Sequence, residues 1–174
     1  MALRETCSLK LVVDGCPTSG SKEVVWNNLE EIGRFERLPW LCIWDFNQVL
    51  NCDGKKGGKQ CNQRRVTSFN DLLNKCGLVD LQFKGPKFTW RNNRGGDELI
   101  MERIDMAFAN SMWRELFDKV LVFVEAAIGS DHNPLVLDTE IPLQRVGKLF
   151  KSLDYGGGLQ GYYIRGLGSR LEWS

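Results

Sequence analysis

The chain is short of several features, and each shortage excludes a class of protein. It has one histidine, and none of its six cysteines stands in a C-x-x-C pair, so the closely spaced ligands of a structural zinc site are missing. No apolar run approaches the roughly 20 residues that span a bilayer, and no apolar stretch behind a basic start indicates a signal peptide. We therefore expect a nuclear or cytoplasmic protein with reduced thiols, neither secreted nor bound to a membrane.

A charge imbalance is also missing. The sequence has 23 Lys and Arg against 22 Asp and Glu, and the net charge of +1 neither requires nor excludes a nucleic-acid partner. Hydrophobic residues make up 43% of the chain, which is enough to bury a core and too much for a disordered chain. By length, the 174 residues are one domain or a piece of a larger one.

Short apolar runs alternate with amphipathic segments along most of the chain. Apolar runs predict strands or extended segments at 9–13, 40–43, 78–83, 87–91, 99–104, 120–124 and 135–137. Three- and four-residue spacing of apolar side chains predicts one helix that Pro39 ends and a second that Gly77 ends. Two short helical segments are predicted at 105–110 and, after a Ser111 cap, at 112–117. This alternation predicts an α/β layered fold.

The chain divides into three parts by composition. Residues 1–7 are a short lead, and residues 8–142 carry the periodic segments of the predicted domain. Residues 143–174 are rich in glycine and have no periodic apolar face, so we expect a poorly ordered tail there.

Three polar stretches lie at the ends of predicted strands: WDFN at 44–47, RID at 103–105 and SDHNP at 130–134. In α/β sheets, catalytic side chains gather at strand ends, because the strand fixes them and the following loop is exposed. Carboxylates can hold a divalent cation or orient water, and an imidazole and an amide can contact phosphate oxygens. The set is therefore suited to phosphodiester hydrolysis.

Each of these residues also has a purely structural interpretation, which the pattern alone leaves open. Asp45 and Asp131 are common turn or cap residues, and a lone histidine such as His132 is more often a surface or core residue. Arg103 and Asp105 can form a surface ion pair. Other side chains with an ordinary explanation are the core candidate Trp90 and the solvated loop residues Lys55, Lys56, Lys59, Arg64 and Arg65.

An ordered series of motifs resembles a known family. PWLCIWDFN at 39–47, GG at 57–58, CGLVDL at 76–81, GPKFTW at 85–90, RIDMAFAN at 103–110 and SDHNP at 130–134 follow one another as they do in plant LINE-type (non-LTR) retrotransposon endonucleases. These belong to the endonuclease/exonuclease/phosphatase superfamily. The resemblance covers roughly residues 8–142 and implies a DNase I-like, four-layer α/β sandwich, of which this chain resembles the C-terminal half.

The resemblance implies a role for each matched residue. Asp45 would orient or deprotonate the attacking water, and Asn47 would bind the phosphate. Asp131 would assist the leaving group or a Mg²⁺ ion, His132 would contact the scissile phosphate, and Asp105 would hold the His132 ring. The implied partner is DNA, which the family nicks with Mg²⁺. The expected nucleic-acid contacts are Trp90, Arg103, Lys55 and Lys56.

The sequence also departs from the family. Trp44 replaces a glycine and is expected to crowd the site, and Asp14 replaces a tyrosine. The glutamate that holds the metal lies in the N-terminal half of the family's domain, so we expect a partial site, centred on Asp131, with little or no activity. One lobe alone is one mixed or antiparallel sheet with helices on its outer face, and its bare inner face would favour self-association.

Two other functions remain open, and one geometric test distinguishes a site from scattered turn residues. The alternatives are a non-catalytic module that binds nucleic acid or a protein partner, and an intact phosphoesterase for small phosphates. If the nuclease interpretation holds, five residues meet in one cluster about 10 Å across: Asp45, Asn47, Asp105, Asp131 and His132. An Asp105 oxygen should then lie about 2.6–3.2 Å from a ring nitrogen of His132.

Overall fold

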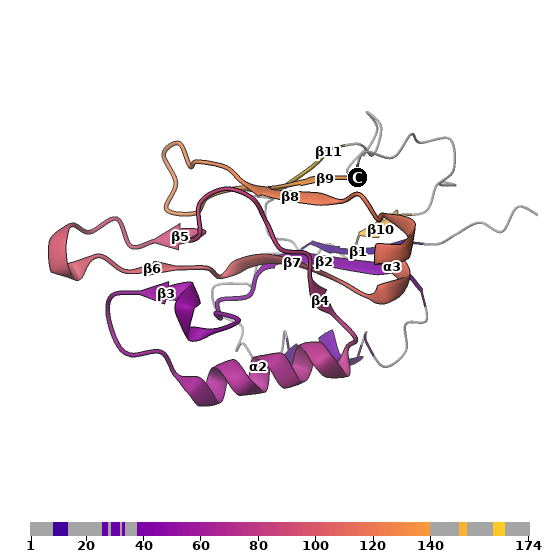
Figure 1. Ribbon diagram of the computed structural model, residues 1–174, viewed down its shortest axis with the longest axis horizontal. Helices are drawn as coiled ribbons and strands as arrows, with labels where there is room; N and C mark the ends of the chain where they lie inside the picture. Colours follow the sequence, from indigo (N-terminus) through magenta and orange to yellow (C-terminus); the bar gives the residue numbers. More distant parts are fainter. Residues whose placement is uncertain are drawn as a thin grey trace, which may run out of the picture.

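The computed structural model describes residues 9–13, 26–27, 29–31, 33, 38–139, 150–152 and 162–165. Figure 1 shows these residues in layers, with the long helix on one side of a central sheet and a second sheet on the other. Two features decide where the candidate site lies. These are the alternation of side chains in the central sheet and the loops at one end of it.

The central sheet has five strands in the order β10-β1-β2-β7-β4. Their bounds are Phe150–Ser152 (β10), Leu9–Val13 (β1), Trp40–Asp45 (β2), Asp105–Ala109 (β7) and Val79–Asp80 (β4). The strands β10, β1 and β2 are parallel, whereas β7 is antiparallel to both β2 and β4. The sheet is therefore mixed, as expected from the sequence.

Two smaller sheets complete the arrangement. One has the order β11-β9-β8, formed by Tyr162–Arg165 (β11), Leu135–Asp138 (β9) and Leu121–Val124 (β8). The other has the order β3-β6-β5, formed by Lys55–Lys56 (β3), Met101–Glu102 (β6) and Trp90–Arg91 (β5). Short 3-10 turns at Cys52–Gly54 (η1) and Gly96–Glu98 (η2) precede β3 and β6. In Figure 1 the β3-β6-β5 sheet extends from one end of the molecule.

Helix α2 (Gln63–Lys75) is the one whose bounds the sequence indicates best. The side chain of Asn62 accepts a hydrogen bond from the Arg65 amide and caps the first turn. After the last turn, Gly77 adopts a positive φ of 63°, the conformation for which glycine is favoured at the end of a helix. Its buried face consists of the apolar residues whose three- and four-residue spacing predicts the helix: Val66, Phe69, Leu72 and Leu73. Of the helix predicted before Pro39, the described residues (26, 27, 29–31 and 33) are helical.

Two hydrophobic clusters cover the two faces of the central sheet. The α2-side cluster includes Trp40, Cys42, Trp44, Met106 and Phe108 together with the buried face of α2. The inter-sheet cluster packs Leu41, Ile43, Ala107 and Ala109 against Val122, Val124, Leu135 and Leu137 of β8 and β9. The expectation of a single sheet with a bare inner face is therefore wrong at β2 and β7. Because β8 and β9 cover that face, strands β2 and β7 expose no surface there through which the protein could self-associate.

Several predicted segments differ from the structure. Residues 105–110 were expected to be helical, but 105–109 form β7, because pairing on both sides with β2 and β4 overrides the helix propensity of Ala and Met. The following helix α3 (Ser111–Leu116) is capped by the Asn110 side chain and not by Ser111. The predicted strands at 78–83 and 87–91 shrink to β4 and β5, since the chain between them passes from the central sheet to the edge of β8.

Two further expectations need correction. Cys52 and Cys61 form a disulfide, with 5.5 Å between their Cα atoms, whereas Cys42 and Cys76 are buried free thiols. In the part expected to be a poorly ordered tail, residues 150–152 and 162–165 are strands paired with β1 and β9. Among the described residues, no helix has the length and apolar character to cross a membrane.

Candidate active site

Asp45 and Asp105 lie opposite each other on neighbouring antiparallel strands. Asp45 ends β2, Asp105 begins β7, and the two are register partners. Side chains alternate between the two faces of a strand, so both carboxylates share the face of Leu41, Ile43 and Ala107. The inter-sheet cluster therefore ends in two acids at this end of the sheet.

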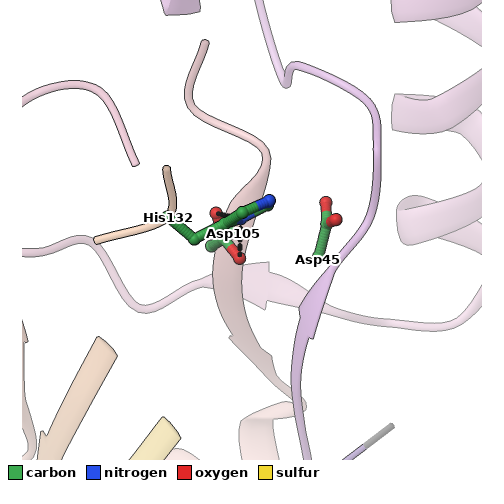
Figure 2. Close-up of side chains that lie close together, drawn as sticks. All are labelled: Asp45, Asp105 and His132. Carbon is green, nitrogen blue, oxygen red and sulfur yellow. Dashed lines mark hydrogen bonds and ion pairs between the residues drawn. The ribbon is translucent and has the colours of Figure 1, made fainter. Parts of the chain in front are cut away.

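His132 reaches the acids from the other sheet, on the loop between β8 and β9. Its Nδ1 lies 3.1 Å from Asp105 Oδ2 and 3.3 Å from Oδ1. Figure 2 shows the ring beside Asp105, with Asp45 on the adjacent strand. Asp45, Asp105 and His132 each offer one ligand atom, and these three atoms lie within 4.8 Å of one another. Three of the five residues predicted to meet therefore share one cluster, and the predicted distance between Asp105 and His132 is confirmed.

The surroundings of His132 favour its charged form. The hydrogen bond with Asp105 has the largest effect and raises the pKa of the imidazole above its ordinary value of 6.5. Partial burial opposes this shift, while the negative charges of Asp105, Asp45 and Asp131 add to it. Since Nδ1 faces the carboxylate, a protonated ring can present Nε2–H to an anionic group such as a phosphate.

A tight turn after β2 holds Asn47 against Asp45. Asn47 has a positive φ of 48°, a conformation that asparagine tolerates better than most residues. Its backbone amide donates to Asp45 Oδ1 at 2.8 Å, and its side-chain Nδ2 donates to Asp45 Oδ2 at 3.1 Å. The predicted site residue Asn47 thus lies directly beside the cluster.

Asp131 is anchored by Trp90. The indole Nε1 of Trp90 donates to Asp131 Oδ2 at 2.9 Å, and the Arg91 amide donates to the Asp131 carbonyl at 3.0 Å. The Trp90 ring packs on the cluster of Val49, Val66 and Ile104 and lies 6.5 Å from the His132 ring, centroid to centroid. Trp90 therefore holds Asp131 and packs beside His132, on the loop between β8 and β9.

Two positioning residues were not assigned a role from the sequence. The buried hydroxyl of Thr89 accepts from the amides of Ile104 and Asp105, at 3.1 and 2.9 Å, and so fixes the start of β7. Asn133 accepts from the Ala127 amide at 3.0 Å and donates to the Phe88 carbonyl at 2.9 Å. Thr89 lies in the motif GPKFTW and Asn133 in SDHNP. Their place in these family motifs was the sequence signal that could have identified them.

The predicted nucleic-acid contacts have different surroundings. Arg103 is largely buried, makes two hydrogen bonds of 2.9 Å with Asp80, and stacks on the Phe83 ring. Lys55 forms an ion pair with Glu102 of β6. Lys56 is exposed. Arg103 and Lys55 are therefore engaged in ion pairs within the protein. Of Arg103, Lys55 and Lys56, the exposed Lys56 is the most accessible to a nucleic acid.

Trp44, which stands where the family has a glycine, does not crowd the site. Because it alternates with Asp45, Trp44 points to the opposite face of the sheet, where it is 7% exposed and packs against Phe46. The expected obstruction is therefore wrong, and the indole belongs to the core. Asp14, the other departure, lies outside the described residues.

Comparisons with known proteins place the fold. No protein-family model and no curated protein matches the chain. A solved structure, the endonuclease domain of TRAS1, a telomere-specific non-LTR retrotransposon, is similar, with a TM-score of 0.51 and 21% sequence identity. The similarity covers 68% of this chain and 52% of that one, so the chain spans about half the length of that domain. The chain has the mixed α/β, DNase I-like fold of such an endonuclease.

Proposed function

We propose that the chain is a retroelement-derived DNA endonuclease-like fragment, corresponding to the C-terminal half of a plant LINE-type domain. The observation that carries the proposal is the cluster of Asp45, Asp105 and His132, with ligand atoms within 4.8 Å of one another. These residues come from two sheets and are far apart in sequence, so their meeting is not a by-product of a single turn. The shared fold adds support.

In this proposal each residue acts on a phosphodiester. His132, held by Asp105 and favoured in its charged form, donates from Nε2 to a non-bridging phosphate oxygen. Asp45 accepts a proton from the attacking water or orients it, and Asn47 contacts the phosphate beside it. Asp131 orients a water molecule that gives a proton to the departing oxygen.

Mg²⁺ fits the donor chemistry of the cluster. Mg²⁺ takes oxygen ligands and often uses only one or two carboxylates, with water and phosphate oxygens completing the shell. Asp45 and Asp105 supply two such carboxylates within the cluster. Asp131, the ligand expected from the sequence, is not in that group, and its Oδ2 accepts from Trp90. A bound ion would offset the charge that develops on the phosphate.

The first test uses the single histidine of the chain, whose ring protons give an unambiguous NMR signal. Addition of a short DNA duplex should shift the His132 resonances and raise the pKa of its imidazole further, because a phosphate stabilises the charged ring. The matched control is Asp105→Asn, in which this response should weaken. If the His132 resonances do not respond to DNA, the nuclease proposal fails.

The second test measures cleavage. Because the family resemblance places the glutamate ligand of the metal outside the residues that this chain matches, we expect the chain alone to nick supercoiled DNA no faster than background in Mg²⁺. Robust nicking that is lost in His132→Ala would refute the proposed inactivity and establish that the cluster suffices.

One observation favours a second function, a non-catalytic nucleic-acid binding module. Lys56, Lys59, Arg64 and Arg65 are all exposed along the segment between β3 and the first turn of α2. A basic surface of this kind binds the phosphate backbone with strong salt dependence. Salt-dependent DNA binding that is unchanged in His132→Ala would favour this function over the first.

A further inference from the structure

The loop between β8 and β9 presents an unusually exposed apolar side chain. Ile128 is 98% exposed, whereas the other exposed large hydrophobic residues in the described part of the chain are 36–48% exposed. Single exposed apolar residues are common on protein surfaces, so exposure alone carries no argument. What distinguishes Ile128 is the rigidity and the position of its loop.

Hydrogen bonds tie the two arms of this loop together. Asn133 Oδ1 accepts from the Ala127 amide at 3.0 Å, next to Ile128, and the Glu125 amide donates to the Pro134 carbonyl at 3.0 Å. Directly after Ile128, Gly129 turns the chain with a φ of 75°. Ile128 is therefore held at the tip of an anchored loop. Its β-branched side chain has few rotamers to lose on contact with a ligand.

The same loop carries the candidate catalytic histidine, four residues further along. Its returning arm lies against β5, through the bridge between Trp90 and His132 and the hydrogen bond from the Arg91 amide to the Asp131 carbonyl. In Figure 1 the loop reaches toward the end of the molecule where β5 and β6 lie. A small phosphate bound at His132 need not touch the tip of this loop. A long polymer that places one phosphate at His132 extends past it.

We propose that Ile128 is a DNA-contacting residue that enters a groove of the duplex beside the phosphate bound at His132. Its side chain packs on deoxyribose and base edges, or inserts between two base steps as the apolar wedge residues of minor-groove-binding proteins do. This inference rests on the proposed nuclease function and adds to it a residue that contacts the duplex beside the bound phosphate. Anchoring by Asn133 would keep the wedge and the histidine at a constant spacing.

The test compares equilibrium binding of a DNA duplex by the full chain and by Ile128→Ala at several salt concentrations. Because Ile128 is exposed, the substitution should leave the thermal transition unchanged. We expect an affinity loss of about tenfold, the size typical of removing a buried aliphatic group from water-excluded contact. The slope of log affinity against log salt should not change, because an apolar contact releases no counterions.

Two matched variants make the result specific. Leu116→Ala removes a 42% exposed leucine from α3, which Figure 1 shows at the opposite end of the molecule from β5, and should bind like the parent chain. Lys56→Gln should lower the salt slope by about 0.9 if that lysine neutralises one phosphate. The three variants thus separate an apolar contact from an ionic one.

The outcomes distinguish this inference from the function on which it rests. If DNA shifts the His132 resonances but Ile128→Ala binds as tightly as the parent chain, the wedge is refuted and the nuclease proposal stands. If Ile128→Ala changes the sedimentation of the protein and not its DNA affinity, Ile128 serves self-association and the inference is also refuted. If the parent chain neither binds DNA nor shows shifted His132 resonances, both proposals fall.

Discussion

The two faces of the central sheet have different compositions although they are built by the same two strands. Toward α2, strands β2 and β7 present Trp40, Trp44, Met106 and Phe108, and Phe46 continues this apolar surface beyond the end of β2. Toward the second sheet they present smaller aliphatic residues, and that surface ends in Asp45 and Asp105.

The difference shows how one strand serves stability and chemistry together. Large aromatic side chains on the α2 face fill the space under the helix, and their burial is the main favourable term in folding. The opposite face packs against the second sheet and also holds two acids at its end, beside the loop that carries His132. Substitutions on the α2 face should therefore act on folding, and substitutions at the acidic end should act on the charge state of His132.

The largest effect is expected from a truncation on the α2 face. Phe69 is fully buried between α2 and the sheet, so Phe69→Ala should lower the free energy of unfolding by about 3–5 kcal/mol. Urea denaturation measures the loss, with Leu116→Ala as an exposed control. If Phe69→Ala does not fold, Phe69→Leu, which leaves a smaller cavity, should fold with a smaller loss. In either folded variant the pKa of His132 should stay raised, and a return to 6.5 would contradict the separation of the two faces.

A smaller and more local effect is expected at the acidic end. Asp105→Asn, Asp45→Asn and Asp131→Asn should each lower the pKa of His132. The decrease should be largest for Asp105, whose hydrogen bond has the greatest influence, and smallest for Asp131. NMR titration of the single histidine gives the order directly. A larger decrease in Asp45→Asn than in Asp105→Asn would show that charge, and not the hydrogen bond, controls the ring.

The smallest effect is a pH dependence of stability. The pKa of His132 is raised in the folded protein, so its contribution to stability is fully present below pH 6.5 and is lost as the pH rises through the raised value. The difference in unfolding free energy between the parent chain and His132→Gln should therefore shrink from acidic to alkaline pH. A difference that grows with pH would mean that the folded protein favours the neutral ring.

How much of this could be predicted differs between the fold and the site. Helix α2 was predictable, because its cap, its buried face and its terminal glycine all agree locally. Strand β7 was not, because RIDMAFAN favours a helix in isolation and becomes a strand only between β2 and β4. The disulfide between Cys52 and Cys61 was missed, since pairing depends on the path of the intervening loop.

The residues of the candidate site were more predictable than the residues that hold them in place. Ordered motifs indicated that five residues meet, and three of them, Asp45, Asp105 and His132, do so in one cluster. The hydroxyl of Thr89 and the amide of Asn133 act through backbone groups from other segments, and a sequence does not display which backbone groups will be nearby. The burial of Arg103 against Asp80 likewise depends on tertiary contacts.

The pairing of Asp45 with Asp105 has a consequence for which insertions and deletions the chain tolerates. Insertions in the connections between β2 and β7 lengthen loops and leave the pair opposed, at little energetic cost. Deletion of one residue inside β2 instead moves every later side chain of the strand to the opposite face. The Asp45 carboxylate would then point toward the aromatic cluster under α2, and the Trp44 ring toward the second sheet. Variants of this chain with longer loops between the two strands should therefore still fold with both acids opposed, while single-residue deletions inside either strand should prevent folding.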